Sequence, residues 1–329
     1  MKILVLGGTV FVGRHFTQAA LDRGHQVTLF NRGQHNPELF PEAQKLRGDR
    51  DGGLAVLEGH RWDAVLDASG YLPRLVRASA KMLSTMASHY TFISSISVYA
   101  DTSQSGIDEN SPVGDLADRS IEEINEVTYG PLKAICEEEV NAQFPGRSLI
   151  VRPGLIVGPD DPTDRFTYWP VRAARGGEIL APNTPNAPVQ FIDVRDLSSW
   201  MIDMIEKQTV GVFTATGPDY RLSMSHLLES CIEVRGGDAQ ITWVDEEFLI
   251  SSGVSEWMDL PLWLYTEKEK GLLATNVTKA IASGLIFRPL EETIKETAQW
   301  ALDRKPGHEW RAGLDRDREN RLLAAWHKK

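Results

Sequence analysis

Residues 1–13 read MKILVLGGTVFVG, and this stretch decides how the fold begins. The run KILVL at 2–6 has the apolar, β-branched composition of a buried strand. Two glycines follow it directly, and another comes five residues later. The next segment, VGRHFTQAALDRGH at 12–25, has the spacing of a helix with one apolar face and reaches Gly24, a typical helix end. We therefore expect a strand, a tight glycine turn and a helix in direct succession.

The position of the glycines predicts a dinucleotide-binding loop. In such a unit Gly7 permits the tight turn, and Gly13 permits close packing of the helix on the strand. The middle position of the G-x-x-G-x-x-G pattern holds Val10 instead of glycine. The helix still opens with the N–H groups of Phe11, Val12 and Gly13, which together with the helix dipole favour an anion. The alternative is an ordinary tight turn that binds nothing.

The end of the next β-rich run, QVTLFNR at 26–32, bears on the choice of cofactor. NAD-preferring folds place Asp or Glu there to bind the ribose 2′-hydroxyl, but this chain has Asn31 followed by Arg32. A guanidinium can pair with a 2′-phosphate, so the sequence favours NADP over NAD, with an exposed loop charge as the alternative role of Arg32. In GDRD at 48–51, Asp49 is either an acceptor for the adenine amino group or a turn residue.

Strands and helices continue to alternate through the first half of the chain. Residues 63–69, 89–95 and the apolar run at 147–159 read as further buried strands, and 74–87 reads as a helix. This alternation predicts an α/β fold with a parallel sheet. After Pro159 the chain becomes rich in proline, aspartate and asparagine, which are loop signals.

The change in composition divides the chain into two predicted domains. The run at 189–207 reads as a strand leading into a helix, and 211–218 reads as another strand, so the sheet resumes after the loops. The predicted dinucleotide-binding domain comprises residues 1–155 and 189–216, and the substrate-binding lobe comprises 156–188 and 217–329.

The segment TYGPLKAICEEEV at 128–140 carries a candidate catalytic pair. Tyr129 and Lys133 are four residues apart, so a helix places them on one face. Pro131 is tolerated in a first helical turn, and Thr128 is expected to cap that turn. A nearby lysine lowers the pKa of a phenol, and such a phenol can transfer a proton at a carbonyl–alcohol centre.

Two further segments place small or hydroxylated residues at the ends of strands. FISSISVYA at 92–100 offers serines that could orient a substrate oxygen, or that merely form a serine-rich exit from the strand. The small residues of DASGY at 67–71 would let a nucleotide lie against the backbone.

Six motifs occur in order: GGTVFVG, GDRD, SSISVY, YGPLK, RPGLIVGP and FIDVRDL. Together they resemble the extended short-chain dehydrogenase/reductase family, which includes sugar-nucleotide epimerases and dehydratases, over roughly residues 1–217. The resemblance implies a Rossmann fold, in which a doubly wound parallel sheet carries a smaller C-terminal substrate lobe.

The resemblance also implies roles for individual residues. Tyr129 would be the general acid/base, and Lys133 would bind the cofactor ribose and modulate the pKa of the phenol. Ser95 would orient the substrate oxygen, with Ser94 and Ser97 as alternatives. Residues expected to contact the cofactor are Gly7, Thr9, Phe11, Val12, Gly13, Asn31, Arg32, Asp49, Ala68, Ser69, Gly70, Tyr129, Lys133 and, near the nicotinamide, Pro153.

Three positions depart from the pattern of the family. Val10 replaces the middle glycine, Leu132 replaces the serine of YGxSK, and IVGP at 156–159 lacks the tyrosine of VYGP. The loop without its middle glycine is similar to an atypical branch that includes chloroplast stem-loop-binding proteins, which act on RNA. The Ser–Tyr–Lys set is retained.

The composition of the chain limits the cellular compartment and the binding partners that we expect. The net charge of −11 counts against general nucleic-acid binding, because phosphate backbones repel an acidic protein. Two distant cysteines, Cys136 and Cys231, favour a reducing compartment, and with no secretory pattern or membrane-length apolar run we expect a cytoplasmic protein. The histidines lack ligand spacing, so no metal is expected. The expected partners are a small-molecule substrate and, by resemblance, a second copy of the chain in a homodimer.

The sequence therefore predicts an NAD(P)-dependent epimerase, dehydratase or reductase acting on a hydroxyl- or carbonyl-bearing substrate, with a sugar nucleotide as one candidate. Two alternatives use the same fold. One is an RNA-binding or ribonuclease-like protein, and the other is a cofactor-sensing module without catalysis.

Overall fold

A seven-stranded parallel sheet forms the first domain of the computed structural model, which describes residues 1–304 and 307–329. The strands, in spatial order, are β3 (Gln44–Arg47), β2 (Gln26–Asn31), β1 (Lys2–Leu6), β4 (Trp62–Asp67), β5 (Ala87–Ile93), β6 (Ser148–Pro153) and β10 (Gly211–Ala215). Val5 of β1 lies between Leu29 of β2 and Leu66 of β4. The order reverses at β1, which creates a topological switch point beside it. The predicted α/β class with a Rossmann-type sheet is confirmed.

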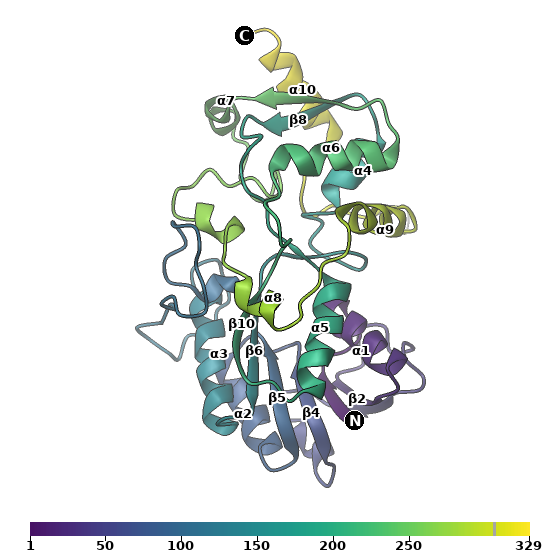
Figure 1. The fold of residues 1–329 in the computed structure, drawn as a ribbon, viewed down its shortest axis with the longest axis vertical. Helices are drawn as coiled ribbons and strands as arrows, with labels where there is room; N and C mark the ends of the chain where they lie inside the picture. Colours follow the sequence, from purple (N-terminus) through teal and green to yellow (C-terminus); the bar gives the residue numbers. More distant parts are fainter. Residues whose placement is uncertain (305–306) are drawn as a thin grey trace.

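Helices cover both faces of this sheet (Figure 1). They are α1 (Phe11–Asp22) and α5 (Val194–Glu206) on one face, and α2 (Pro73–Leu83) and α3 (Tyr129–Gln143) on the other. Successive strand residues point to opposite faces, so Ile3 and Val5 join the core under α1 and α5. Leu4 and Leu6 join the core under α2 and α3. The continuous apolar run of β1 is thereby explained, because both of its faces are buried.

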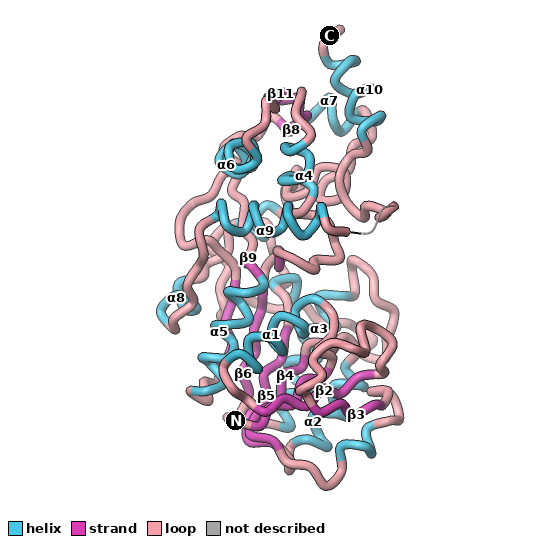
Figure 2. Tube along the Cα trace, turned by 90° about the vertical axis from the view of Figure 1, so that its right-hand side faces the viewer, coloured by secondary structure: helices cyan, strands magenta, loops and turns pink. Residues whose placement is uncertain are grey.

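A smaller lobe stacks on this domain along the long axis of the molecule (Figure 1). It contains α4 (Tyr168–Ala174), β8 (Glu178–Pro182), α6 (Met224–Arg235), β11 (Gln240–Val244), α7 (Glu246–Ser251), α9 (Leu290–Leu302) and α10 (Arg316–Trp326). The strands β8 and β11 pair in parallel, and the lobe has its own core, with Phe166, Trp169 and Trp263 fully buried. Figure 2 shows α9 crossing between this lobe and the sheet domain.

Short elements complete the chain. They are β7 (Ile156–Val157), β9 (Ile192–Asp193), α8 (Thr278–Ala282) and the 3₁₀ turns η1 (Leu54–Leu57), η2 (Ile96–Val98) and η3 (Lys270–Leu273). The sequence predicted a single strand at 147–159, and this prediction is wrong. This run leaves the main sheet after β6, and its second part, β7, pairs with β9. The predicted domain boundaries stay a prediction.

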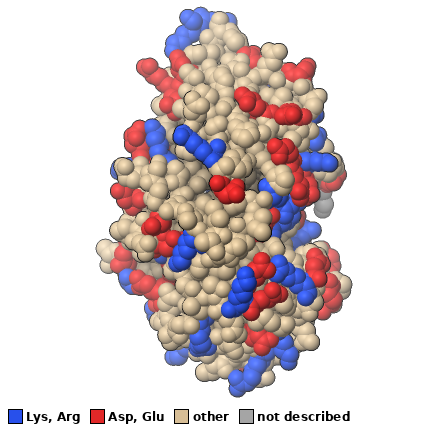
Figure 3. Space-filling view, in the orientation of Figure 1, with Lys and Arg blue, Asp and Glu red and all other residues tan. Residues whose placement is uncertain are grey.

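Charges of both signs are interspersed on the face drawn in Figure 3. Lysines and arginines on this face lie among aspartates and glutamates, in line with the net charge of −11. Within residues 1–304 and 307–329, none of the helices combines the length and the apolar character that crossing a bilayer requires.

Gly13→Ala tests the packing of α1 on the glycine turn. A Cβ added at Gly13 would lie 2.7 Å from the backbone nitrogen of Gly8, so the helix must shift. We expect a loss of about 2 kcal/mol in the free energy of unfolding, typical of overpacking, although alanine is the better helix former. Urea denaturation measures the loss. Gln18→Ala, on the exposed face of α1, should change the midpoint little, and equal midpoints for both variants would refute the constraint.

Candidate functional site

A cavity of about 520 Å³ opens at the carboxyl ends of β1, β2 and β4, beside the topological switch point. This is the place where open α/β sheets bind ligands. Ten of the predicted cofactor residues line it: Gly7, Thr9, Phe11, Val12, Gly13, Asn31, Arg32, Asp49, Ala68 and Ser69. Gly70, Tyr129, Lys133 and Pro153 are not part of its wall. Gly70 is buried behind it, and Pro153 is buried at the end of β6.

The glycine loop presents the first turn of α1 to this cavity. Gly7 and Gly8 have φ angles of +112° and +92°, which side-chain-bearing residues rarely adopt. Val10, in contrast, has the extended φ of −130°, so its position does not require glycine. It makes no side-chain cap, and the first-turn N–H groups therefore remain available to an anion. The loop fits a pyrophosphate despite the missing glycine.

Asn31, at the end of β2, also makes hydrogen bonds within the protein, and its predicted contact with a cofactor stays a prediction. Its amide nitrogen donates to the carbonyl of Gly7 at 2.8 Å, and its oxygen accepts from the N–H of Gly33 at 2.9 Å. Asn31 therefore positions the glycine loop. Arg32 and Asp49 face each other across the rim at 3.9 Å, and both side chains are more than half exposed. Both remain accessible to the adenosine end of a dinucleotide.

A buried ion pair that the sequence reasoning missed supports the same wall. Arg50 donates to both carboxylate oxygens of Asp67, at 2.7 and 2.5 Å, and Asp67 also accepts from Tyr90 at 2.8 Å and from the N–H of Ser69 at 3.1 Å. Burial acts to raise the pKa of Asp67, but its bonds with Arg50 outweigh that effect and lower it. The pair fixes the chain after β4, where Ala68 and Ser69 line the cavity.

The N-terminus of α3 brings Tyr129 and Ser95 together. Helix α3 begins at Tyr129, with Pro131 in its first turn, as predicted. Gly130 allows α3 to lie close to the 3₁₀ turn η2, because a Cβ at Gly130 would collide with the carbonyl of Ser97. Thr128 occupies the N-cap position but does not cap the helix with its side chain. Its hydroxyl donates to the carbonyl of Glu123 at 2.6 Å instead.

Three groups act on the Tyr129 phenol. Burial raises its pKa above the ordinary value, and the charge of Tyr71 acts in the same direction. A hydrogen bond with the Ser95 side chain and the charge of Arg165 oppose this shift. The phenol is therefore protonated at neutral pH. Of the alternative serines, Ser94 is buried and bonds Glu137, whereas Ser97 is exposed.

Lys133 is buried and bonds backbone carbonyls, and its predicted contact with a cofactor ribose stays a prediction. The residue is 3% exposed, and its ammonium donates to the carbonyls of Gly70 and Ile93, both at 2.6 Å. It also lies 4.1 Å from the centre of the Phe92 ring and 5.3 Å from that of Tyr71. The lysine thus joins the ends of β4 and β5. Its charge is not among the causes that shift the pKa of the phenol, in contrast to the sequence-based expectation.

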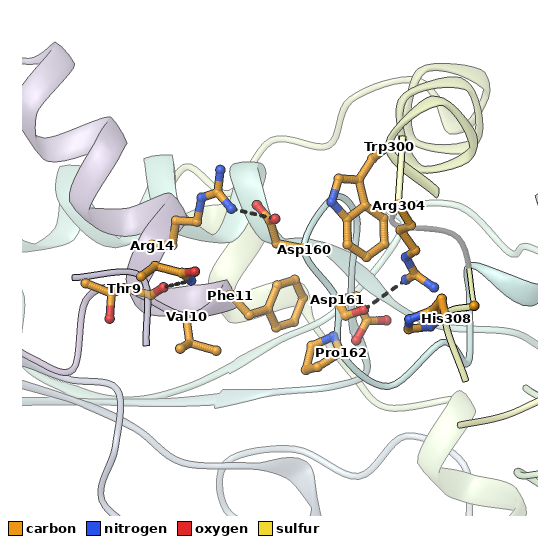
Figure 4. Close-up of a pocket in the computed structure, with 12 residues that line it drawn as sticks. Thr9, Val10, Phe11, Arg14, Asp160, Asp161, Pro162, Trp300, Arg304 and His308 are labelled. Carbon is orange, nitrogen blue, oxygen red and sulfur yellow. Dashed lines mark hydrogen bonds and ion pairs between the residues drawn. The ribbon is translucent and has the colours of Figure 1, made fainter. Parts of the chain in front are cut away.

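The glycine loop also forms one wall of a second cavity, of about 440 Å³ (Figure 4). The facing wall includes Trp300 and Arg304 of the C-terminal lobe. Arg14 of α1 donates to Asp160 at 2.6 Å, and Arg304 donates to the fully buried Asp164 at 2.6 Å. The Arg14–Asp160 pair therefore ties α1 to the loop after β7, and the Arg304–Asp164 pair lies within the smaller lobe. Across residues 1–304 and 307–329, no cluster of three or more His, Cys, Asp or Glu side chains is arranged to hold a metal ion.

Comparison with known proteins identifies the family. Residues 3–214 match the NAD dependent epimerase/dehydratase family. The chain belongs to this family. One similar solved structure is that of UDP-glucuronic acid 4-epimerase from Bacillus cereus in complex with NAD, with a TM-score of 0.64 and 16% sequence identity. The match covers 91% of this chain and 98% of the epimerase chain. At that identity the likeness shows the fold alone.

Two relatives differ in what their names describe. The chloroplast stem-loop binding protein of 41 kDa b from Arabidopsis thaliana is 26% identical over 259 residues, which are 71% of this chain and 63% of that protein. A 2-alkyl-3-oxoalkanoate reductase from Stenotrophomonas maltophilia (strain K279a) is 30% identical over 182 residues, which are 49% of this chain and 52% of the reductase. The chain spans less than two thirds of the length of either relative.

Lys133→Met tests the burial of the ammonium. Burial lowers the pKa of Lys133 to about 8 from an ordinary 10.5, so the unfolded chain binds more protons between these values. The free energy of unfolding of the wild type should therefore rise with pH across this window, relative to the variant, by up to about 3 kcal/mol. Urea denaturation at pH 7 to 10.5 measures the difference. Lys81→Met, on the exposed face of α2, should show no such trend, and a pH-independent difference for Lys133→Met would contradict the placement.

Proposed function

We propose that this protein is an NAD(P)-dependent oxidoreductase or epimerase that acts at a hydroxyl- or carbonyl-bearing carbon of a small molecule. The observation that carries the proposal is the Tyr129 phenol at the start of α3, where the neighbouring Ser95 side chain acts to lower its pKa. On the neighbouring strand edge, the glycine loop and the first turn of α1 line a cavity suited to a dinucleotide. Membership of the NAD dependent epimerase/dehydratase family supports this reading.

Residues at the carboxyl ends of β1, β2 and β4 would hold the cofactor. The N–H groups opening α1 would bind the pyrophosphate, Ala68 and Ser69 would lie against the nucleotide, and the rim residues Arg32 and Asp49 would contact the adenosine end. When bound, the nicotinamide accepts or donates a hydride at the reacting carbon. We propose NADP as the preferred form, because Arg32 offers a guanidinium where a carboxylate would repel a 2′-phosphate.

Tyr129 would move the proton. In the reducing direction the phenol donates to the substrate oxygen, for which its raised pKa keeps it protonated at neutral pH. In the oxidising direction the deprotonated phenolate would accept the proton of the substrate hydroxyl, and the raised pKa of Tyr129 disfavours that form at neutral pH. Ser95 would donate to the substrate oxygen and fix its distance from the phenol. Lys133 holds the ends of β4 and β5 in place and would reach the ribose only with the N–H that its two carbonyl partners leave free.

RNA binding is the second candidate function, and the name of the Arabidopsis thaliana relative supports it. The charge of −11 and the interspersed surface charges shown in Figure 3 argue against it, because a phosphate backbone needs a basic surface. The reductase among the relatives supports hydride transfer instead. A salt-dependent shift of labelled stem-loop RNA in a gel would favour the RNA function.

Tyr129→Phe separates catalysis from cofactor binding. The variant keeps the ring but loses the proton donor, so we expect turnover of an active carbonyl substrate to fall at least about 100-fold while NADH or NADPH binds with unchanged affinity. Nicotinamide absorbance reports turnover, and quenching of tryptophan fluorescence reports binding. Tyr220→Phe, a surface tyrosine of the C-terminal lobe, is the matched control. Binding by the wild type without turnover on any substrate would favour a cofactor-sensing module, and no binding at millimolar cofactor would remove the enzyme proposal.

Arg32→Ala tests the proposed preference for NADP. Removing the guanidinium should weaken NADPH binding by about 10-fold or more. NADH binding should stay nearly unchanged, because NADH lacks the 2′-phosphate with which Arg32 would pair. Fluorescence titration with both cofactors gives the ratio of affinities. Arg61→Ala, an exposed change directly before β4 and so at the amino ends of the strands, should leave that ratio unaltered. A parallel loss of affinity for both cofactors in Arg32→Ala would refute the assignment.

A further inference from the structure

Arg165 is a half-buried cation without a protein partner. Its Nε atom is buried and makes no hydrogen bond, and within the described parts of the chain the guanidinium forms no ion pair. The centre of the Trp257 ring lies 5.2 Å from the guanidinium carbon. Two other arginines of the same lobe are paired: Arg172 with Glu319 and Arg304 with Asp164, both at 2.6 Å. An unpaired buried cation is costly, so its retention calls for a ligand.

The backbone around Arg165 is held in place although its head group is free. The preceding residue, Asp164, is fully buried and accepts from Arg304 at 2.6 Å and from the N–H of Arg311 at 3.0 Å. The following residue, Phe166, is fully buried in the core of the lobe. A charged group on such a rigid segment is preorganised, which is what a binding residue requires.

Arg165 and Tyr129 are close enough to influence each other. The guanidinium acts to lower the pKa of the phenol, and the phenol acts to raise that of the guanidinium. Tyr129 belongs to α3 of the sheet domain, whereas Arg165 lies in the loop before α4 of the smaller lobe. A molecule bound between the two lobes would therefore meet a proton donor on one side and a cation on the other.

The surroundings favour a substrate with a single negative charge. Glu256 precedes Trp257 in the chain, and burial raises the pKa of Glu269 with the charges of Glu256 and Glu126 acting in the same direction. The carboxylate of Asp161 also acts on Arg165, although burial raises the pKa of Asp161 to about 6. A diphosphate would bring more negative charge to this acidic neighbourhood than one guanidinium can neutralise. The two N–H groups on an edge of a guanidinium match the two oxygens of a carboxylate.

We propose that Arg165 binds a carboxylate of the substrate and so selects oxo or hydroxy acids over neutral carbonyl compounds. The inference rests on the proposed function, because it places the reacting carbon of that acid at Tyr129. It adds the substrate class, a carboxylic acid, and names Arg165 as the residue that determines it.

The test uses the full-length protein with a series of 2-oxo and 3-oxo acids, each paired with its methyl ester, and with uridine diphosphate as a diphosphate probe. Binding is measured by calorimetry with and without saturating NADH, and turnover by nicotinamide absorbance. We expect acids to be preferred over esters. Arg165→Gln should weaken acid binding and raise the acid KM by about 10- to 100-fold while leaving the binding of the esters nearly unchanged.

Two further variants separate the charge from the fold. Arg165→Lys should restore part of the acid affinity, and Arg316→Gln, which removes an exposed charge from α10, should leave it unaltered. Binding of no acid to the wild type, equal use of acids and esters, or acid binding unaffected by Arg165→Gln would overturn the inference. Tighter binding of uridine diphosphate than of any acid, lost in Arg165→Gln, would replace the carboxylate by a diphosphate. Failure of NADH to bind would instead count against the proposed function, and the titrations without NADH would still decide the role of Arg165.

Discussion

The close approach of α1 to the turn that precedes it is the constraint on which the site depends. A Cβ at Gly13 would lie 2.7 Å from the backbone nitrogen of Gly8, and one at Gly8 would lie 2.6 Å from the Leu29 side chain. The helix can therefore begin directly above β1 and β2 only because these two positions lack side chains. That contact aims the first-turn N–H groups at the switch point of the sheet, where a dinucleotide can be bound. Val10 lies outside this contact in an extended conformation, which explains how the loop keeps its geometry without the usual middle glycine.

Buried ion pairs hold the walls around this turn. Arg50 and Asp67 fix the chain leaving β4, and Arg152 and Glu137 join β6 to α3 at 2.7 Å with both side chains buried. Asp164 and Arg304 do the same for the loop that faces the glycine turn from the smaller lobe. Each of these pairs contributes positioning more than net stability, because the cost of desolvating two charges offsets much of their attraction. Arg165 stands out against this background, since its charge is half-buried next to a fixed backbone and has no such partner.

Much of the fold and part of the site could be predicted from the sequence. The strand, turn and helix at the N-terminus, the parallel sheet, the cavity residues of the glycine loop and the start of α3 at Tyr129 depend on neighbours within a few residues. The predictions that failed concern partners. The side chain of Thr128 bonds to the carbonyl of Glu123 rather than capping the helix, and the apolar run after Arg147 divides because its second part pairs with β9. Periodicity shows which residues are buried but not which of several available groups they contact.

The sequence by itself determined the order of strands and helices, the glycine turn and the four-residue spacing of Tyr129 and Lys133, because these follow from local backbone preferences and side-chain periodicity. Only the tertiary structure decided the surroundings of the charged groups. The partners of Arg50 and Arg304 lie 17 and 140 residues away, and Lys133 binds carbonyls 63 and 40 residues away. Which charges are paired, and which have no partner in the protein, depends on distances in space and on burial, and neither is encoded in the spacing along the chain.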